Sequence, residues 1–112
     1  MQQMESDFGD IITLESIGKT YENRDIMMIK LEADNILMPG SNRKAILMTG
    51  AHHSRELVSV QMPLYMIVDL LHGLVHKNQE KLLLLSQNKY FVIPMLNTDG
   101  SFTIYQKYME TG

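Results

Sequence analysis

The sequence contains no cysteine among its 112 residues. Without cysteine the chain forms no disulfide and no thiolate metal site, so any metal must be held by histidine and carboxylate side chains. Basic clusters are also missing, because the ten Lys and Arg residues are scattered along the chain and the formal net charge is −3. A nucleic-acid-binding protein carries a basic patch, so we expect no nucleic-acid partner.

Long apolar runs are scarce as well. The most apolar stretch, residues 57–71, is interrupted by polar residues and a proline, so we expect no membrane span. Residues 1–10 hold acids and glutamines without an apolar stretch, so no signal peptide is recognisable and the compartment stays unassigned. What is present is an ordinary globular composition, 45% hydrophobic and 21% charged, which predicts one folded domain. The ten methionines are expected to fill irregular gaps in its core.

Apolar runs bounded by turn residues predict four β-strands, at residues 11–17, 26–31, 45–49 and 90–96. The first two runs are joined by a short polar segment, which indicates an antiparallel pair. The third run is compact and stops at Gly50, a pattern typical of a strand that is buried on both faces.

One long helix is predicted over residues 57–76, which are apolar at too many consecutive positions for a strand and indicate burial on most sides. Pro63 lies inside this helix and must either kink it or mark the first turn of its regular part. Residues 79–86 predict a second, short helix, residues 34–44 a loop and residues 97–100 a turn. This order of elements predicts an α/β fold with a mixed β-sheet flanked by helices.

His53 and Glu56 are the strongest candidates for chemistry, because they follow a predicted strand where the chain turns toward a helix. In open α/β sheets, ligands bind at such strand ends. A histidine and a carboxylate three residues apart can converge on one ion, and zinc accepts both ligands while keeping one position open for water. The same spacing occurs by chance in many proteins. A surface histidine beside a helix-start glutamate is therefore the competing interpretation.

Three segments carry a shared pattern in order along the chain. Residues 16–26 read Ser-Ile-Gly-Lys-Thr-Tyr-Glu-Asn-Arg-Asp-Ile, residues 50–57 read Gly-Ala-His-His-Ser-Arg-Glu-Leu, and residues 94–100 read Pro-Met-Leu-Asn-Thr-Asp-Gly. They resemble the Ile-Gly-x-Ser-Tyr-Glu-Gly-Arg-x-Ile segment, the first zinc-ligand motif and the Pro-x-x-Asn-Pro-Asp-Gly turn of the zinc carboxypeptidase A/B family. The departures are Asn23 in place of a usual Gly, Leu57 in place of Trp and Thr98 in place of Pro.

The resemblance implies one Zn²⁺ site, with His53 as its first ligand and Glu56 as its second. It matches Arg55 to an arginine that lines the substrate cleft, although an ion pair with a nearby acid is a comparable role for this side chain. Asn97 and Asp99 match a turn that is structural in the family. Deglutamylating relatives carry Pro-Gly between the two ligands where this chain has Ser-Arg. The resemblance therefore favours an ordinary carboxypeptidase acting on peptide or protein C-termini.

The three other histidines are weaker candidates. His52 could compete with His53, but adjacent extended residues point to opposite sides and the spacing to Glu56 favours His53. His72 and His76 are four residues apart, so on a helix they share a face and could bind metal together. No carboxylate lies at a matching spacing, and solvated helix histidines are the favoured interpretation.

Several functional residues of the family have no counterpart here. The resemblance implies a third zinc ligand, carboxylate-clamping arginines, a tyrosine and a general-base glutamate further downstream, yet no His or Arg follows Gly100. We therefore expect residues 1–112 to be the N-terminal part of a larger catalytic domain. This incomplete domain would hold no catalytic residue of its own. Alone, it is expected to be inactive, to bind zinc weakly, and to expose a sheet edge and apolar surface.

Three functions stay open at this point. The resemblance implies a metallocarboxypeptidase that removes C-terminal amino acids from peptides. A second hypothesis is a non-catalytic carboxypeptidase-like protein, a structural or assembly subunit whose apolar surface is covered by other chains. A third is a related zinc acylase acting on small amido acids, against which the pattern in residues 16–26 argues.

Overall fold

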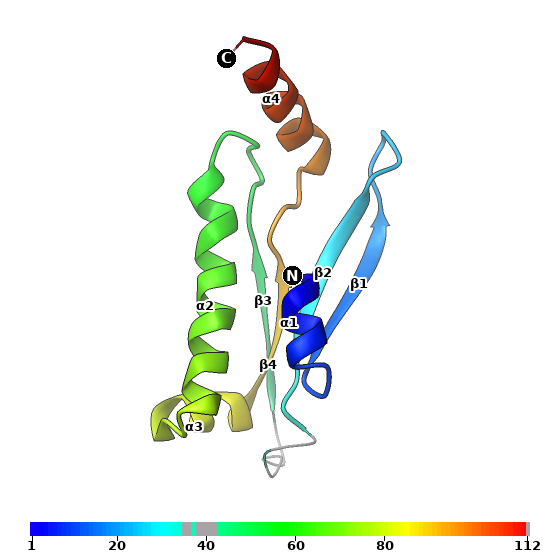
Figure 1. Ribbon diagram of the computed structural model, residues 1–112. Helices are drawn as coiled ribbons and strands as arrows, with labels where there is room; N and C mark the ends of the chain where they lie inside the picture. The colour runs from blue at the N-terminus through cyan, green and yellow to red at the C-terminus, as the bar shows by residue number, and fades with distance from the viewer. Residues whose placement is uncertain (35–36, 38–42, 112) are drawn as a thin grey trace.

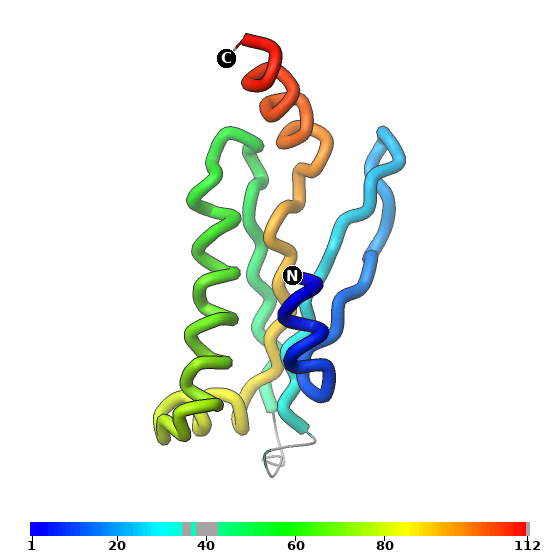
Figure 2. Tube along the Cα trace, in the orientation of Figure 1, coloured from blue at the N-terminus to red at the C-terminus, as the bar shows by residue number. Residues whose placement is uncertain are grey.

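The computed structural model describes residues 1–34, 37 and 43–111. The described chain is elongated, 50 × 26 × 23 Å, and one helix, α4, projects beyond the end of the sheet (Figures 1 and 2). The predicted loop at residues 34–44 lies mostly outside the described residues. The elements in chain order are α1 (Gln2–Asp7), β1 (Ile12–Lys19), β2 (Asp25–Leu31), β3 (Lys44–Thr49), α2 (Leu57–Val75), α3 (Gln79–Gln87), β4 (Asn88–Ile93) and α4 (Thr98–Thr111).

The four strands form one mixed sheet in the order β1-β2-β4-β3. β1 and β2 form an antiparallel hairpin with Leu14 opposite Ile29, and β2 continues antiparallel to β4 with Ile29 opposite Val92. β3 runs parallel to β4, with Met48 opposite Val92. The predicted mixed sheet and the predicted antiparallel pairing of the first two strands are both confirmed.

The core lies on one face of this sheet, under α1 and α2 (Figure 1). Side chains on a strand alternate between the two faces, and the register aligns one apolar row across all four strands. Ile29, Leu31 and Val92 in this layer are fully buried. The helices contribute Met4 and Phe8 from α1 and Ile67, Leu70 and Leu71 from α2.

No helix covers the opposite face of the sheet within the described part of the chain. Leu47 and Phe91 are register partners on this face, and Leu47 is 63% exposed. Its strand, β3, also lies at the edge of the sheet. The prediction that residues 45–49 are buried on both faces is therefore wrong, because only the face toward α2 is packed.

Helix α2 agrees with the predicted helix in extent, but only one stripe of it is buried. Ile67 and Leu70 face the sheet, whereas Val58, Met62 and Tyr65 are exposed. The predicted burial on most sides is wrong. With 19 residues and a mean hydropathy of 1.4, α2 has the length and apolar character of a membrane-crossing helix, contrary to the expectation from sequence. Length and composition alone are weak evidence, because core helices pass the same test.

Pro63 is buried inside α2 beyond its first turn, and it does not end the helix. Because proline lacks an N–H, the carbonyl of Ser59 has no helical donor four residues later. This carbonyl lies against Gly50, where an added Cβ would come within 2.2 Å of the Ser59 oxygen and 2.5 Å of the Pro94 oxygen. Glycine therefore allows the end of β3 to pass directly beside the start of α2.

Two helices were not predicted. Residues 2–7, for which no element was predicted, form α1. The predicted turn at residues 97–100 instead starts α4, because the Asn97 Oδ1 accepts a hydrogen bond from the Gly100 amide at 3.0 Å and caps the helix. Asn and Asp favour turns and helix caps for the same reason, namely side-chain bonds to nearby amides.

Candidate metal centre

The loop between β3 and α2 carries the candidate ligands, and it runs beside the connection from β4 to α4. The Gly50 amide donates to the Ile93 carbonyl at 2.9 Å, and the Leu96 amide returns a bond to the Gly50 carbonyl at 2.9 Å. The Asn97 amide then donates to the Ala51 carbonyl at 3.0 Å. The carboxyl ends of two parallel strands are thus joined here, which is where ligands bind in α/β sheets.

Ala51 turns the chain out of the strand with a left-handed φ of 48°. This conformation is uncommon for a residue with a Cβ and persists only when its surroundings hold it. Here the Ala51 amide donates to the Ser59 Oγ at 2.9 Å, and the Ser59 hydroxyl in turn donates to the Glu56 carbonyl at 2.5 Å. The loop is therefore fastened at both ends by one side chain of α2.

The structure brings His53 and Glu56 together. The Nδ1 atom of His53 lies 3.0 Å from the Oε1 atom of Glu56, and the two side chains are 74% and 50% exposed. Zinc holds nitrogen and oxygen ligands at roughly 2.0–2.2 Å in a tetrahedron, so two ligand atoms on one ion lie about 3.3 Å apart. The donor types, their separation and their exposure all fit two positions of a zinc site.

A third donor is not in place within the described part of the chain, where no group of three His, Cys, Asp or Glu side chains could hold a metal ion. His52 is engaged elsewhere, because its Nε2 lies 2.7 Å from the Thr49 Oγ1. Catalytic zinc sites use three protein ligands and a water. The described residues therefore offer two candidate ligands of such a set, His53 and Glu56.

Arg55 lies beside the candidate ligands on an open depression of about 320 Å³, which is lined by His53, Ser54, Arg55, Asn97 and Ile104. The Arg55 side chain is exposed and forms no ion pair with any residue that the structure describes. The alternative role for Arg55, an ion pair with a nearby acid, is thus not observed in this part of the molecule.

Asn97 links the metal-ligand loop to α4. Its Nδ2 donates to the His52 carbonyl at 3.2 Å, while its Oδ1 accepts from the Gly100 amide. One side chain therefore both caps a helix and holds the residue that precedes His53. This agrees with the structural role expected for Asn97.

Asp99 ties the turn between β1 and β2 to the start of α4. Its carboxylate accepts hydrogen bonds from the Thr20 hydroxyl at 2.7 Å, the Glu22 amide at 3.1 Å and the Arg24 guanidinium at 2.6 Å. The Arg24 guanidinium also pairs with Glu22 and lies 4.0 Å from the centre of the Phe102 ring. The first and third sequence motifs therefore form a single cluster.

These contacts shift the pKa values of both charged partners. Burial acts to raise the pKa of Asp99, but the bonds from Thr20, Arg24 and the Glu22 amide outweigh it and hold the pKa below its ordinary value. Bonding to Glu22 and then to Asp99 raises the pKa of Arg24. Asn23 lies within the same turn at a φ of 63°, a conformation that asparagine tolerates, which explains how it can stand where the pattern has glycine.

The roles of two side chains in this region were not predicted from the sequence. Ser59, which fastens the loop, is one of the polar residues that interrupt the apolar stretch at residues 57–71. Thr20 is one position of the motif in residues 16–26. A polar residue in the first turn of an otherwise apolar helix is a usable signal, since a buried hydroxyl needs a partner. The contact between Thr20 and Asp99 spans 79 positions, and no local signal indicates it.

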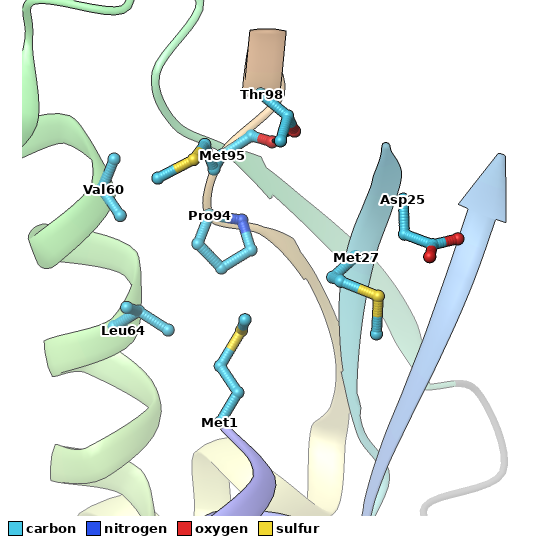
Figure 3. A pocket seen from close by; sticks show the side chains of 8 residues that line it. All are labelled: Met1, Asp25, Met27, Val60, Leu64, Pro94, Met95 and Thr98. Atoms are coloured by element: carbon cyan, nitrogen blue, oxygen red, sulfur yellow. Dashed lines mark hydrogen bonds between the residues drawn. The ribbon is translucent and has the colours of Figure 1, made fainter. Parts of the chain in front are cut away.

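A second hollow lies apart from the candidate ligands. Figure 3 shows Met1, Met27 and Met95 around this cavity of about 160 Å³, with the Asp25 carboxylate directed away from it. Asp25 instead accepts a bond from the Ser16 hydroxyl at 2.6 Å and pairs with Lys19 at 2.8 Å. The flexible methionines line an irregular apolar gap, and we assign this cavity no chemistry. Met4, Met48 and Met66 pack against the core, but no described methionine is buried, so the expectation that the methionines fill gaps in the core is confirmed only in part.

The mixed sheet thus carries an exposed His–Glu pair beyond the end of β3, a strand that is parallel to its neighbour. The family follows from comparison of the sequence. Residues 1–110 match the zinc carboxypeptidase family, and the chain belongs to it.

Curated relatives include one named a zinc carboxypeptidase and several named inactive metallocarboxypeptidases. A zinc carboxypeptidase of Saccharothrix mutabilis subsp. capreolus is 34% identical over 100 residues, which are 89% of this chain and 22% of the relative. The inactive metallocarboxypeptidase ECM14 of Uncinocarpus reesii is 31% identical over 105 residues, with 89% of this chain and 17% of the relative covered. The chain thus spans about a fifth of the length of these relatives.

Solved structures confirm the predicted carboxypeptidase-like fold. The structure of thrombin activatable fibrinolysis inhibitor matches this chain with a TM-score of 0.81, and the match covers 95% of this chain and 25% of the inhibitor chain. The two sequences are 19% identical, a likeness that shows the fold alone. Carboxypeptidase A from Helicoverpa armigera matches 93% of this chain with 24% of its own, at a TM-score of 0.73 and 26% identity.

Proposed function

We propose that this chain supplies two of the zinc ligands of a metallocarboxypeptidase that removes C-terminal amino acids from peptides. The observation that carries the proposal is the His53–Glu56 pair, with donor atoms 3.0 Å apart and exposed beyond the end of β3. Membership of the zinc carboxypeptidase family supports Zn²⁺ as the metal. Residues 1–112 are proposed to be the N-terminal part of the catalytic domain.

In this proposal each side chain has a separate task. His53 and Glu56 hold the ion, and Arg55 lines the substrate cleft, where a guanidinium can bind a carboxylate or carbonyl oxygen of the peptide. When bound, zinc lowers the pKa of its water to about 7 and polarises a carbonyl. Ser59 and Asn97 hold the loop, so that both ligands keep one orientation. The third ligand and the general base are proposed to lie outside this chain.

A second candidate function is a non-catalytic, carboxypeptidase-like subunit with a structural or assembly role. Several curated relatives favour it, because they are named inactive metallocarboxypeptidases, including one of Saccharomyces cerevisiae that is 29% identical over 99 residues. In that case other chains would cover the exposed face of the sheet. A reading frame that continues past Gly112 with a further His and Glu favours the enzyme.

The zinc content of a version extended past Gly112 tests the proposal, with His53→Ala as the variant and His52→Ala as the matched control. We expect His53→Ala to hold one zinc per chain fewer than the parent, and His52→Ala to hold as much zinc as the parent. Equal zinc in all three proteins would remove His53 from the site. Release of C-terminal amino acids by the zinc-loaded extended protein separates the enzyme from the non-catalytic subunit.

The chain of residues 1–112 is proposed to be inactive alone, because two ligands leave the ion weakly held and no general base is present. Peptide hydrolysis assays with added zinc check this expectation. Zinc-dependent release of C-terminal amino acids by this chain would contradict the proposed division of the site.

A further inference from the structure

The remaining two histidines lie together at the end of α2 that is opposite to the candidate zinc site. His72 and His76 are one helical turn apart, with ring centroids 4.0 Å apart and ring planes inclined by 22°. Both side chains are exposed. Since α2 has 19 residues, and a helix rises about 1.5 Å per residue, its length separates this pair from the His53–Glu56 pair.

The backbone holds His76 in one tautomer. Its Nδ1 lies 3.0 Å from the His72 carbonyl oxygen, and a carbonyl only accepts hydrogen bonds, so Nδ1 carries the proton. In the neutral ring the lone pair is then on Nε2. Histidines that bind metals commonly donate their other N–H to a backbone carbonyl in this way, which fixes the ring and makes the ligand nitrogen more basic.

Both rings border an open groove of about 280 Å³ between α1 and α2. From α1 the groove receives Asp7, whose carboxylate accepts a bond from the Gln3 amide at 2.9 Å. A carboxylate beside two imidazoles favours a cation over an anion in this groove. Within the described residues no set of three donors is formed, so the ion would be held by two imidazoles and water.

We propose that His72 and His76 chelate a divalent late first-row transition-metal ion, such as Ni²⁺, Cu²⁺ or Zn²⁺, across the last turn of α2. Metal–nitrogen bonds of roughly 2.0–2.1 Å place two ligand nitrogens about 3–4 Å apart. With their ring centroids 4.0 Å apart, the two imidazoles are within reach of one ion. Imidazole favours these ions over Ca²⁺ and Mg²⁺, which take oxygen ligands.

Such an ion links His72 in the last turn of α2 to His76 at its end, where the chain turns toward α3. The turn runs through Lys77, which has a left-handed φ of 54°. An ion that binds the folded helix stabilises the folded chain by mass action. The site is independent of the proposed function, because it shares no residue with the His53–Glu56 pair.

Titration with Ni²⁺ by isothermal calorimetry tests the site, in a His53→Ala background that removes the candidate zinc ligand. We expect one bound ion per chain, and roughly tenfold or weaker affinity in His72→Gln and in His76→Gln, because either change destroys the chelate. His52→Gln serves as the control and should bind like the parent. Circular dichroism verifies that each variant keeps its helix content.

Three results would overturn the proposal. They are no Ni²⁺ binding by the His53→Ala parent, unchanged affinity in either variant, or half as many bound Ni²⁺ ions per chain in a variant at unchanged affinity. The last result would mean two independent imidazoles. A measurement that needs no substitution at the site is nuclear magnetic resonance of the imidazole nitrogens during addition of Zn²⁺. The Nε2 resonances of both rings should shift together, and a shift of only one would contradict a shared ion.

Discussion

Gly50 is the residue at which the candidate site depends most directly on backbone geometry. Its Cα faces the Ser59 carbonyl of α2 and the Pro94 carbonyl after β4. From the sequence, Gly50 is only the end of a strand. Glycine is needed here for two reasons. Pro63 leaves the Ser59 carbonyl without a helical donor, and the Pro94 carbonyl lies close by although it is distant in sequence.

Gly50→Ala is therefore expected to destabilise the chain. An added Cβ would lie 2.2 Å from one backbone oxygen and 2.5 Å from another, and neither can move independently of its element. Overpacking of this kind costs about 1–3 kcal/mol, measurable by urea unfolding. Gly9→Ala is the control, because its Cβ would meet a single oxygen at 3.0 Å. Equal losses in the two variants would contradict the steric argument.

Asp99 predicts a pH dependence of stability. Its pKa in the folded chain lies below the ordinary value, so its hydrogen bonds stabilise the fold above the unfolded pKa and are lost as the pH falls through the folded pKa. Asp99→Asn should lower the free energy of unfolding at pH 7, and its difference from the parent should shrink below about pH 4. Urea unfolding at pH 7 and at acidic pH checks this. A difference that stays constant with pH would exclude the carboxylate charge as the cause.

At the scale of elements, helix α4 shows that a local signal can be identified correctly and still be assigned to the wrong element, here a turn in place of the start of a helix. Asn97 and Asp99 indicate side-chain bonds to nearby amides, and Asn97 forms such a bond with Gly100, whereas Asp99 bonds to the distant residues Thr20, Glu22 and Arg24. The helix that follows has no buried residue, so its apolar pattern gave no sign of an element that packs on the sheet. Thr98 is its first residue, a position where proline is also accommodated, which accounts for that departure from the family pattern.

Asn97→Ala should remove the cap of α4 and the bond to the His52 carbonyl together. Loss of a helix N-cap costs about 0.5–2 kcal/mol, which urea unfolding detects. Asn97→Asp separates the two roles, because aspartate keeps the cap acceptor and lacks the amide donor. We expect Asn97→Asp to retain most of the stability and to weaken zinc binding in the extended protein. Equal destabilisation by both variants would mean that the bond to His52, and not the cap, stabilises the chain.

The strands and the long helix could be predicted because their apolar residues face a core. β1, β2 and β4 show this directly, since Ile29, Leu31 and Val92 are buried in the centre of the sheet. The pair His53 and Glu56 could be named from spacing and resemblance, and the structure places their donor atoms together. The cluster of Thr20, Arg24 and Asp99 could not be predicted, because it joins segments whose contact depends on the whole fold.

At the scale of the whole molecule, the most evident property is the uncovered apolar surface. Leu47 on the free face of the sheet and Val58, Met62 and Tyr65 on α2 are all exposed. β3 adds an edge whose outer backbone groups have no strand partner in the described part of the chain. An exposed sheet edge and exposed apolar surface were expected from the sequence, and the described residues confirm both.

Such a surface predicts concentration-dependent self-association of the 112-residue chain, since exposed edges and apolar patches pair with other chains. Leu47→Lys should reduce this association, because it places a charge on the apolar part of the free face. Thr13→Lys adds the same charge on that face at the opposite edge strand and is the matched control. Sedimentation velocity over a range of concentrations measures the effect. A monomer at every concentration would contradict the prediction.

The position of β4 in the sheet also sets an order for folding. The hairpin of β1 and β2 joins neighbouring segments, whereas β3 pairs only with β4, with Lys44 opposite Asn88. Both α2 and α3 must be synthesised before this pairing is available. Contacts between distant segments form more slowly than local ones. The hairpin is therefore expected to form first, with the outer edge of β2 unpaired until β4 is available. During synthesis, the sheet closes only when residues 88–93 have left the ribosome and entered between β2 and β3.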